Sequence, residues 1–235
     1  MGFFDRFKKK STYEEQNPIS KQALENRSPL IDKTPDKVIA GLEELNYFAY
    51  ADLADLNQIK DELGKGLAEQ HYFPYIESGN PRYEGIDPRQ YILDNETLFE
   101  EGGILDALNE MAPLFSIMNI RMEISDHLEV YDPLTGLEHR ITLNGKSYTI
   151  FDRWEGYGWG EAAQRFADIV NDQLSLQNCS ERIYLIQGGN DGRAVFLTSE
   201  QYAFVRPLIG DIKECPLPTK EWCETWAVIC ENVID

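Results

Sequence analysis

Apolar residues recur at helical spacing over the first part of the chain. Residues 34–45 place valine, isoleucine and leucine side chains on one face, and Thr34 and Pro35 suit the cap and the first turn of a helix. Residues 52–70 carry a similar stripe of leucines with one isoleucine. The sequence therefore predicts two amphipathic helices here, each with one buried face.

Helical spacing returns in two later segments. One begins at an Asn95 cap, is interrupted at Gly102-Gly103, and is stopped or kinked by Pro113. The other covers residues 161–177, and its predicted buried stripe consists of Ala162, Phe166, Ile169, Val170 and Leu174. The pattern thus predicts helices on both sides of a central segment that has a different period.

That central segment alternates apolar and polar residues, which is typical of β-strands. Residues 120–130, apart from Asp126, place apolar side chains at even positions and polar ones at odd positions, and this predicts a half-buried strand. A turn at residues 132–136 and the hairpin signal Asn144-Gly145 then predict three antiparallel strands in sequence, a meander. Pairing outward from Asn144-Gly145 predicts three opposed pairs, which are Ile141 with Tyr148, His139 with Ile150, and Thr142 with Ser147.

Two further apolar runs, residues 183–186 and 194–197, are predicted to form central strands joined by a glycine-rich turn. The fold class we predict is α+β, with a mostly antiparallel sheet of meander and hairpins covered by helices. Residues 1–33 are interpreted as a basic tip and a flexible, disordered tail or linker, and residues 34–235 as a single acidic domain. A subdivision near residue 118 is the alternative domain organisation.

Charge is divided unevenly along the 235 residues. The first ten residues carry four Lys/Arg and one Asp, a net of +3, and the remainder carries 18 Lys/Arg and 40 Asp/Glu, a net of −22. Nucleic-acid binding is therefore excluded, because it requires basic residues that displace counterions from phosphates. An acidic body suits a basic protein partner, and solubility alone is the other explanation.

The basic tip has the composition of a weak membrane-surface contact, in which aromatic rings enter the headgroup layer and lysines meet anionic lipid. Its candidate contact residues are Phe3, Phe4, Phe7, Lys8, Lys9 and Lys10. A frayed terminus with incidental lysines is the alternative. We find no secretion signal and no apolar run that could span a bilayer. The expected location is therefore the cytoplasm of a bacterial-type cell, with the inner membrane surface as the alternative.

Cysteine and histidine spacing gives no metal or redox motif. The four cysteines (Cys179, Cys215, Cys223 and Cys230) lack CxxC spacing, and the three histidines do not cluster with them in the sequence. We therefore expect no metal site and no cofactor, and we expect the cysteines to be reduced.

One pair of residues is a candidate for acid–base chemistry. His127 lies on the polar side of its predicted strand beside Glu129, so it is the histidine we would test as an acid or base. His139 falls on the apolar side of its hairpin and is interpreted as a core histidine. No Ser or Cys has the context of an activated nucleophile. The sequence therefore favours a protein that is not an enzyme.

Binding is the function that the sequence favours. Gly156, Gly158 and Gly160 match neither phosphate-binding fingerprint, so the aromatic residues between them are interpreted as contact anchors or as satellite core. The candidate anchors are Trp154, Tyr157 and Trp159, and the candidate steering residues are Glu96, Glu100 and Glu101. The hypothesis is an acidic binding protein, of inhibitor or immunity type, that engages a basic protein. The alternatives are an enzyme with a carboxylate/His site in a cleft, and a peripheral membrane protein tethered by residues 1–10.

Overall fold

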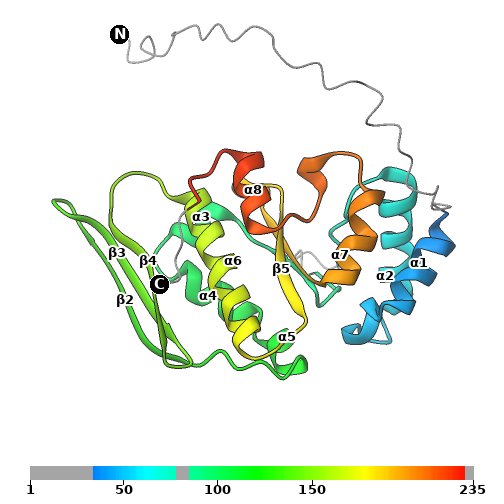
Figure 1. Cartoon of the computed structure of the whole chain (residues 1–235), viewed down its shortest axis with the longest axis horizontal. Coiled ribbons are helices and arrows are strands. Elements are labelled where there is room, and N and C mark those ends of the chain that lie inside the picture. The colour runs from blue at the N-terminus through cyan, green and yellow to red at the C-terminus, as the bar shows by residue number, and fades with distance from the viewer. Residues whose placement is uncertain (1–33, 78–84, 231–235) are drawn as a thin grey trace, which may run out of the picture. The chain divides into compact units, whose positions relative to one another are not determined.

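Two three-stranded antiparallel sheets organise the chain in the computed structural model, which describes residues 34–77 and 85–230 (Figure 1). The first sheet has the order β1 (Gln90–Ile92), β6 (Arg193–Thr198), β5 (Glu181–Ile186). The second has the order β2 (Ile124–Asp132), β3 (Gly136–Leu143), β4 (Lys146–Trp154). The predicted α+β class is confirmed, with the meander forming a sheet of its own.

The helices predicted from apolar periodicity are present as α1 (Pro35–Glu44), α2 (Leu56–Lys65), α3 (Asn95–Phe99), α4 (Gly103–Glu110), α5 (Ala112–Ile117) and α6 (Trp159–Leu176). Two further helices, α7 (Ser199–Val205) and α8 (Thr219–Trp226), lie closer to the C-terminus. A π-helical turn, Gly66–Gln70, continues α2, and four short 3₁₀ turns are Tyr47–Tyr50, Gly189–Asp191, Arg206–Leu208 and Ile212–Glu214. The cap of α3 differs from the expectation, because Asp94 Oδ1 accepts the Thr97 N–H at 3.0 Å. An Asp one residue earlier therefore takes the place predicted for Asn95.

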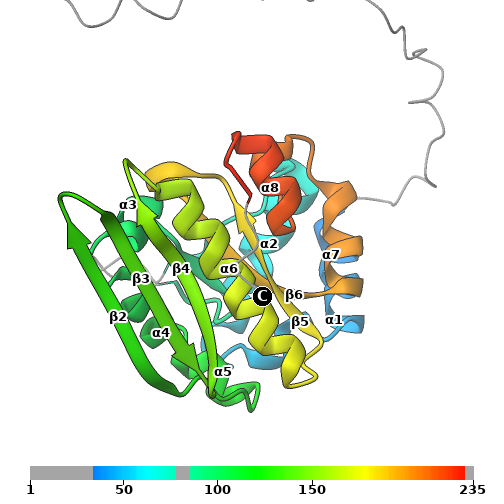
Figure 2. The same ribbon diagram turned by 60° about the vertical axis from the view of Figure 1, so that its left-hand side comes forward.

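Helix α6 lies between the two sheets and contacts β4 on one side and β5 on the other (Figure 2). Its predicted apolar stripe is buried, from Ala162 through Phe166 to Leu174. Helices α1, α2 and α7 pack together at the end of the fold away from the β2–β4 sheet. One continuous apolar core joins these layers.

The pairing of β3 with β4 follows the predicted register near the turn and departs from it farther out. Ile141 pairs with Tyr148 and Thr142 with Ser147, as predicted. His139, however, pairs with Phe151, because the register shifts between His139 and Arg140 and leaves Ile150 as an extra residue in β4. Such a bulge adds one residue to one strand, and simple counting from the turn cannot detect it.

Strand β2 presents the opposite face to the one predicted. The even positions Leu128 and Val130, expected on the buried side, are 39% and 49% exposed. The odd positions His127 and Glu129 instead lie on the side of the sheet that the helices cover, with side chains only 21% and 8% exposed. The assignment of even positions to the core holds for Ile120 and Met122, which pack on the core, and is wrong for residues 127–130. The register shift between Ile124 and Asp126 exchanges the two faces.

A buried arginine joins the β1-β6-β5 sheet to the N-terminal helices. Arg89 is 2% exposed, and its Nε and Nη1 donate to the carbonyls of Tyr47 (2.7 Å) and Phe196 (3.1 Å). Its Nη1 also lies 3.7 Å from Glu181, whose carboxylate accepts the Tyr50 hydroxyl at 2.6 Å. These polar contacts satisfy the charge where water is excluded.

Among the helices that the structure describes, none is long and apolar enough to cross a membrane. The predicted basic tip and linker, residues 1–33, lie outside the described residues, together with the candidate membrane contacts Phe3 to Lys10. All four cysteines are described, and no disulfide joins them.

Candidate functional site

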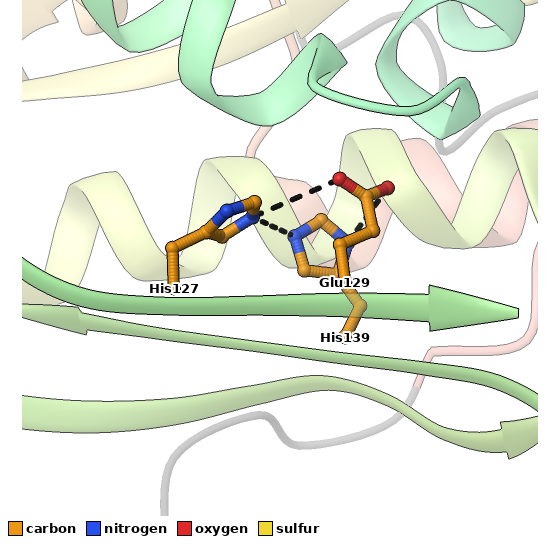
Figure 3. Close-up of side chains that lie close together, drawn as sticks. All are labelled: His127, Glu129 and His139. Atoms are coloured by element: carbon orange, nitrogen blue, oxygen red, sulfur yellow. Dashed lines mark hydrogen bonds and ion pairs between the residues drawn. The ribbon is translucent and has the colours of Figure 1, made fainter.

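Two neighbouring strands bring three polar side chains to the covered face of the second sheet. Glu129 on β2 pairs directly with His139 on β3, so their side chains share a face. His127 precedes Glu129 by two residues and therefore points to the same side. The three side chains form the cluster shown in Figure 3, which we call the His–Glu–His cluster.

The atoms of this cluster lie close enough to interact. The Nε2 atoms of His127 and His139 are 3.0 Å apart. One Glu129 oxygen lies 3.7 Å from His127 Nε2, and the other lies 3.5 Å from His139 Nδ1. The latter two distances exceed those of good hydrogen bonds. The firm hydrogen bond of Glu129 is with the backbone N–H of Gly102, at 2.9 Å, in the loop between α3 and α4.

Burial controls the charge of the cluster. Burial, aided by the neighbouring His127, lowers the pKa of His139 to about 4. Burial also raises the pKa of Glu129 above its ordinary value, against the opposing effects of the Gly102 N–H and His127. His139 is thus neutral at pH 7, and one of its ring nitrogens offers a free electron pair.

A cavity of about 480 Å³ adjoins the cluster. It is lined by Phe99, Glu101, Glu129, Val130, Tyr131, Leu137, Trp154 and Gly156. The cavity therefore joins the candidate acid–base residue Glu129 to two residues predicted for binding, Glu101 and Trp154. Aromatic walls with a few acidic groups are suited to a ligand or side chain that is partly apolar and positively charged.

The predicted aromatic anchors differ in exposure. Tyr157 is 85% exposed, whereas Trp154 and Trp159 are half-buried. Trp154 packs between Phe151, at 5.4 Å between ring centroids, and the Arg165 guanidinium, at 5.0 Å. The Tyr157 and Trp159 rings meet edge to face, 5.7 Å apart. The three residues therefore combine both alternatives, since Trp154 belongs partly to the core and Tyr157 presents a free ring.

The predicted acidic residues also separate. Glu101 is exposed and lines the cavity, and Glu100 beside it is exposed. Glu96 is half-buried and accepts a long hydrogen bond of 3.4 Å from Asn190, in the turn between β5 and β6. Only Glu101 of the three therefore lines the same cavity as Glu129 and Trp154.

Sequence reasoning missed the part played by His139, which was interpreted as a core histidine. The residue is buried, with 2% exposure, but it faces two polar side chains. Counting outward from the Asp132–Gly136 turn would have paired Glu129 with His139, because these two strands keep a regular register there. The Gly102 N–H had no comparable signal, since it comes from a loop distant in the sequence.

Protein-family models, curated proteins and solved structures give no match to this chain. The geometry of the cluster, of the cavity and of the exposed strand beside them is therefore the basis for a functional proposal.

Proposed function

We propose that this protein is an acidic binding module that docks a basic protein segment along the free edge of β2. The observation that carries this proposal is the outward apolar side of an edge strand. In the described residues β2 pairs on one side only, with β3. On the outward side of the strand the exposed apolar residues are Leu128 and Val130. Further exposed apolar residues at its ends and in its turn are Ile124, Tyr131 and Leu134.

An unpaired edge strand offers a row of backbone N–H and C=O groups to another chain. Lysines and prolines are among the edge residues that discourage such pairing, and β2 contains neither. The register shift between Ile124 and Asp126 leaves residues 127–132 as the regular part of this edge. A partner segment in extended conformation could add a strand here, while its side chains contact Leu128 and Val130. The opposite edge strand, β4, exposes the polar residues Ser147 and Thr149 on the same outer face, so it is the less suitable edge.

Charge selects the kind of partner. Strand β2 carries three acidic residues, Asp126, Glu129 and Asp132, and no Lys or Arg. The chain as a whole has a net charge of −19. Negative potential of this kind speeds encounter with a cationic protein and disfavours acidic ones. An inhibitor or immunity-type protein that covers a basic enzyme is one concrete form of the proposal.

The cavity at the end of β2 supplies a place for one anchoring side chain. A Lys or Arg of the partner would there meet the exposed Glu101 carboxylate and the ring of Trp154. A side chain that is buried in a pocket of the partner is the usual form of a binding hot spot. The exposed Tyr157, next to Gly156 of the cavity wall, would cover it.

The test compares two variants that change charge equally. The full chain is used as bait in native lysate at low and moderate salt. Two double variants are used in the same way, Leu128→Lys/Val130→Lys on β2 and, as the control, Ser147→Lys/Thr149→Lys on β4. We expect a stoichiometric basic protein that the wild type and the β4 variant retain at low salt. The β2 variant should bind it about 10- to 100-fold more weakly when the purified pair is titrated, because like charges then face each other. Equal binding by both variants, or no salt-sensitive partner, would contradict the proposal.

An enzyme is the second candidate, and the cavity that Glu129 lines is the observation that favours it. In that case Glu129, beside His127, would exchange a proton with a small substrate held against Glu101 and Trp154. A thermal-shift screen of small cationic metabolites separates the two functions. A compound that stabilises the wild type but not Glu101→Gln would support the enzyme. A screen without such a compound leaves docking at β2 as the preferred function.

A further inference from the structure

The His–Glu–His cluster occupies a position where a sheet normally buries apolar side chains. Its neighbours on the covered face, Leu137, Ile141 and Phe151, are all buried and apolar. Burying a carboxylate and two imidazoles costs free energy unless each polar atom finds a partner. Within the described residues, the Glu129 side chain accepts one hydrogen bond, from the backbone N–H of Gly102. The Glu129 carboxylate is thus buried beside two imidazoles, with few hydrogen bonds to offset the free-energy cost of its burial.

The geometry of the cluster matches a shared ion. One ligand atom from each of the three residues can be chosen so that all lie within 4.8 Å of one another. Two imidazole nitrogens bound to the same tetrahedral Zn²⁺, at about 2.0–2.1 Å each, are about 3.3 Å apart. The observed separation between the two Nε2 atoms is 3.0 Å. Only a small outward movement of the half-buried His127 would therefore be needed.

We propose that His127, Glu129 and His139 bind one divalent transition-metal ion, of the class represented by Zn²⁺ and Co²⁺. Imidazole nitrogen is a ligand of borderline character that these ions prefer, whereas Ca²⁺ and Mg²⁺ require mostly oxygen. The carboxylate supplies one negative charge, and the ion in turn compensates its burial.

The surroundings resemble those of a site with an open coordination position. Three protein ligands leave a fourth position of a tetrahedral ion for water or another ligand. Glu129 also lines the cavity, so this position would be reached from there. The Gly102 N–H holds one carboxylate oxygen, as the outer hydrogen bonds of metal ligands commonly do. The expectation of no metal site rested on spacing along the chain, whereas this cluster arises from pairing across two strands.

Cobalt(II) is the probe that tests the proposal, because its visible absorption reports the number and kind of its ligands. The full chain, prepared without a polyhistidine tag, is titrated with Co²⁺ and then with Zn²⁺ as competitor. We expect one Co²⁺ per chain, displaced by Zn²⁺. His127→Gln and Glu129→Gln should each weaken binding at least about 100-fold, since loss of an outer partner alone costs 10- to 100-fold. His71→Asn is the matched control, because His71 is the exposed third histidine of the chain.

A second measurement needs no variant. Zn²⁺ at 100 times its Kd should raise the Tm of the wild type by about 5–10 °C, and a chelator should reverse the rise. The proposal is overturned if Co²⁺ binding does not saturate, if it survives in folded His127→Gln or Glu129→Gln, or if His71→Asn abolishes it. A sulfur-to-cobalt charge-transfer band would place the ion on the cysteines and would overturn it as well. Absence of the Zn²⁺-dependent rise in Tm would contradict it independently.

Discussion

At the scale of single residues, buried and half-buried charges constrain this protein most. Arg89 is held by two backbone carbonyls and faces Glu181. Asp172 on α6 accepts hydrogen bonds from Lys146 Nζ at 2.7 Å and from the Tyr148 hydroxyl at 2.6 Å, both on β4. Each contact joins segments that are distant in the sequence, so each fixes the position of one layer against another. Their free-energy contribution depends on the charge state, which pH controls.

Asp172→Asn is predicted to lower the free energy of unfolding at neutral pH and to have little effect on it in acid. Burial alone would raise the pKa of Asp172, but the hydrogen bonds from Lys146 and Tyr148 hold it below its ordinary value. A carboxyl group whose pKa is lower in the folded than in the unfolded state stabilises the fold. This stabilisation is complete above the pKa of the unfolded state, about 3.9, and is lost as the pH falls through the pKa of the folded state. The expected loss at pH 7 is about 1–3 kcal/mol in the free energy of unfolding, measured by urea denaturation.

The same urea measurement on Glu224→Gln, an exposed residue of α8, is the control and should change stability by less than about 0.5 kcal/mol. The difference between wild type and Asp172→Asn in the free energy of unfolding should narrow as the pH falls from about 4 towards 2. A difference that stays constant over this range would show that charge is not the reason for it.

At the scale of elements, β2 shows which structural features the sequence pattern predicts and which it does not. Alternation predicted a strand, and Asn144-Gly145 predicted the turn after β3 and the nearest pairs. Alternation could not tell which side the helices cover, because either set of side chains can face them. Here the His–Glu–His cluster faces the helices, and Leu128 and Val130 face solvent. A local rule that fails in this way is expected at functional positions.

The rest of the candidate site could be predicted only in part. His127, Glu129, Glu101 and Trp154 were singled out from their residue types and local pattern. Their meeting at one cavity depends on the α3–α4 loop, which is distant from β2 in the sequence and follows no repeat. The bulge that pairs His139 with Phe151 is likewise set by packing, because both Ile150 and Phe151 are buried.

Substitution of two hairpin glycines by alanine distinguishes the cost of a steric clash from the cost of backbone strain. Gly136 and Gly145 both have positive φ, +85° and +81°. A Cβ on Gly136 would lie 2.4 Å from the Trp154 carbonyl oxygen, whereas a Cβ on Gly145 meets nothing within 4 Å. Gly145→Ala should therefore cost about 1–2 kcal/mol from strain alone. Gly136→Ala should lower the free energy of unfolding by about 1–3 kcal/mol more than Gly145→Ala does, because its Cβ also overpacks the site.

Urea denaturation of both variants at pH 7 checks this order. Gly136→Ala should also disturb the cavity, because Trp154 lines it. Equal losses for the two substitutions would mean that the β3 start does not lie against the end of β4 as described.

At the scale of the whole molecule, the acidic charge and the free edge of β2 point to the same kind of partner. A strand that exposes Leu128 and Val130 is a risk for self-association unless something covers it or like charges oppose it. The net charge of −19 opposes pairing between copies of the chain and favours a cationic partner. Docking at this edge is therefore the central claim about function.

Amide hydrogen exchange of the full chain, alone and with the partner that it retains at low salt, tests this claim most directly. The account predicts that the partner slows exchange of the β2 amides, Ile124–Asp132, because a new strand would pair with their free edge. Exchange in β4, Lys146–Trp154, should stay unchanged away from the cavity. Protection confined to β4 or to α1 and α2, with β2 unaltered, would contradict the account.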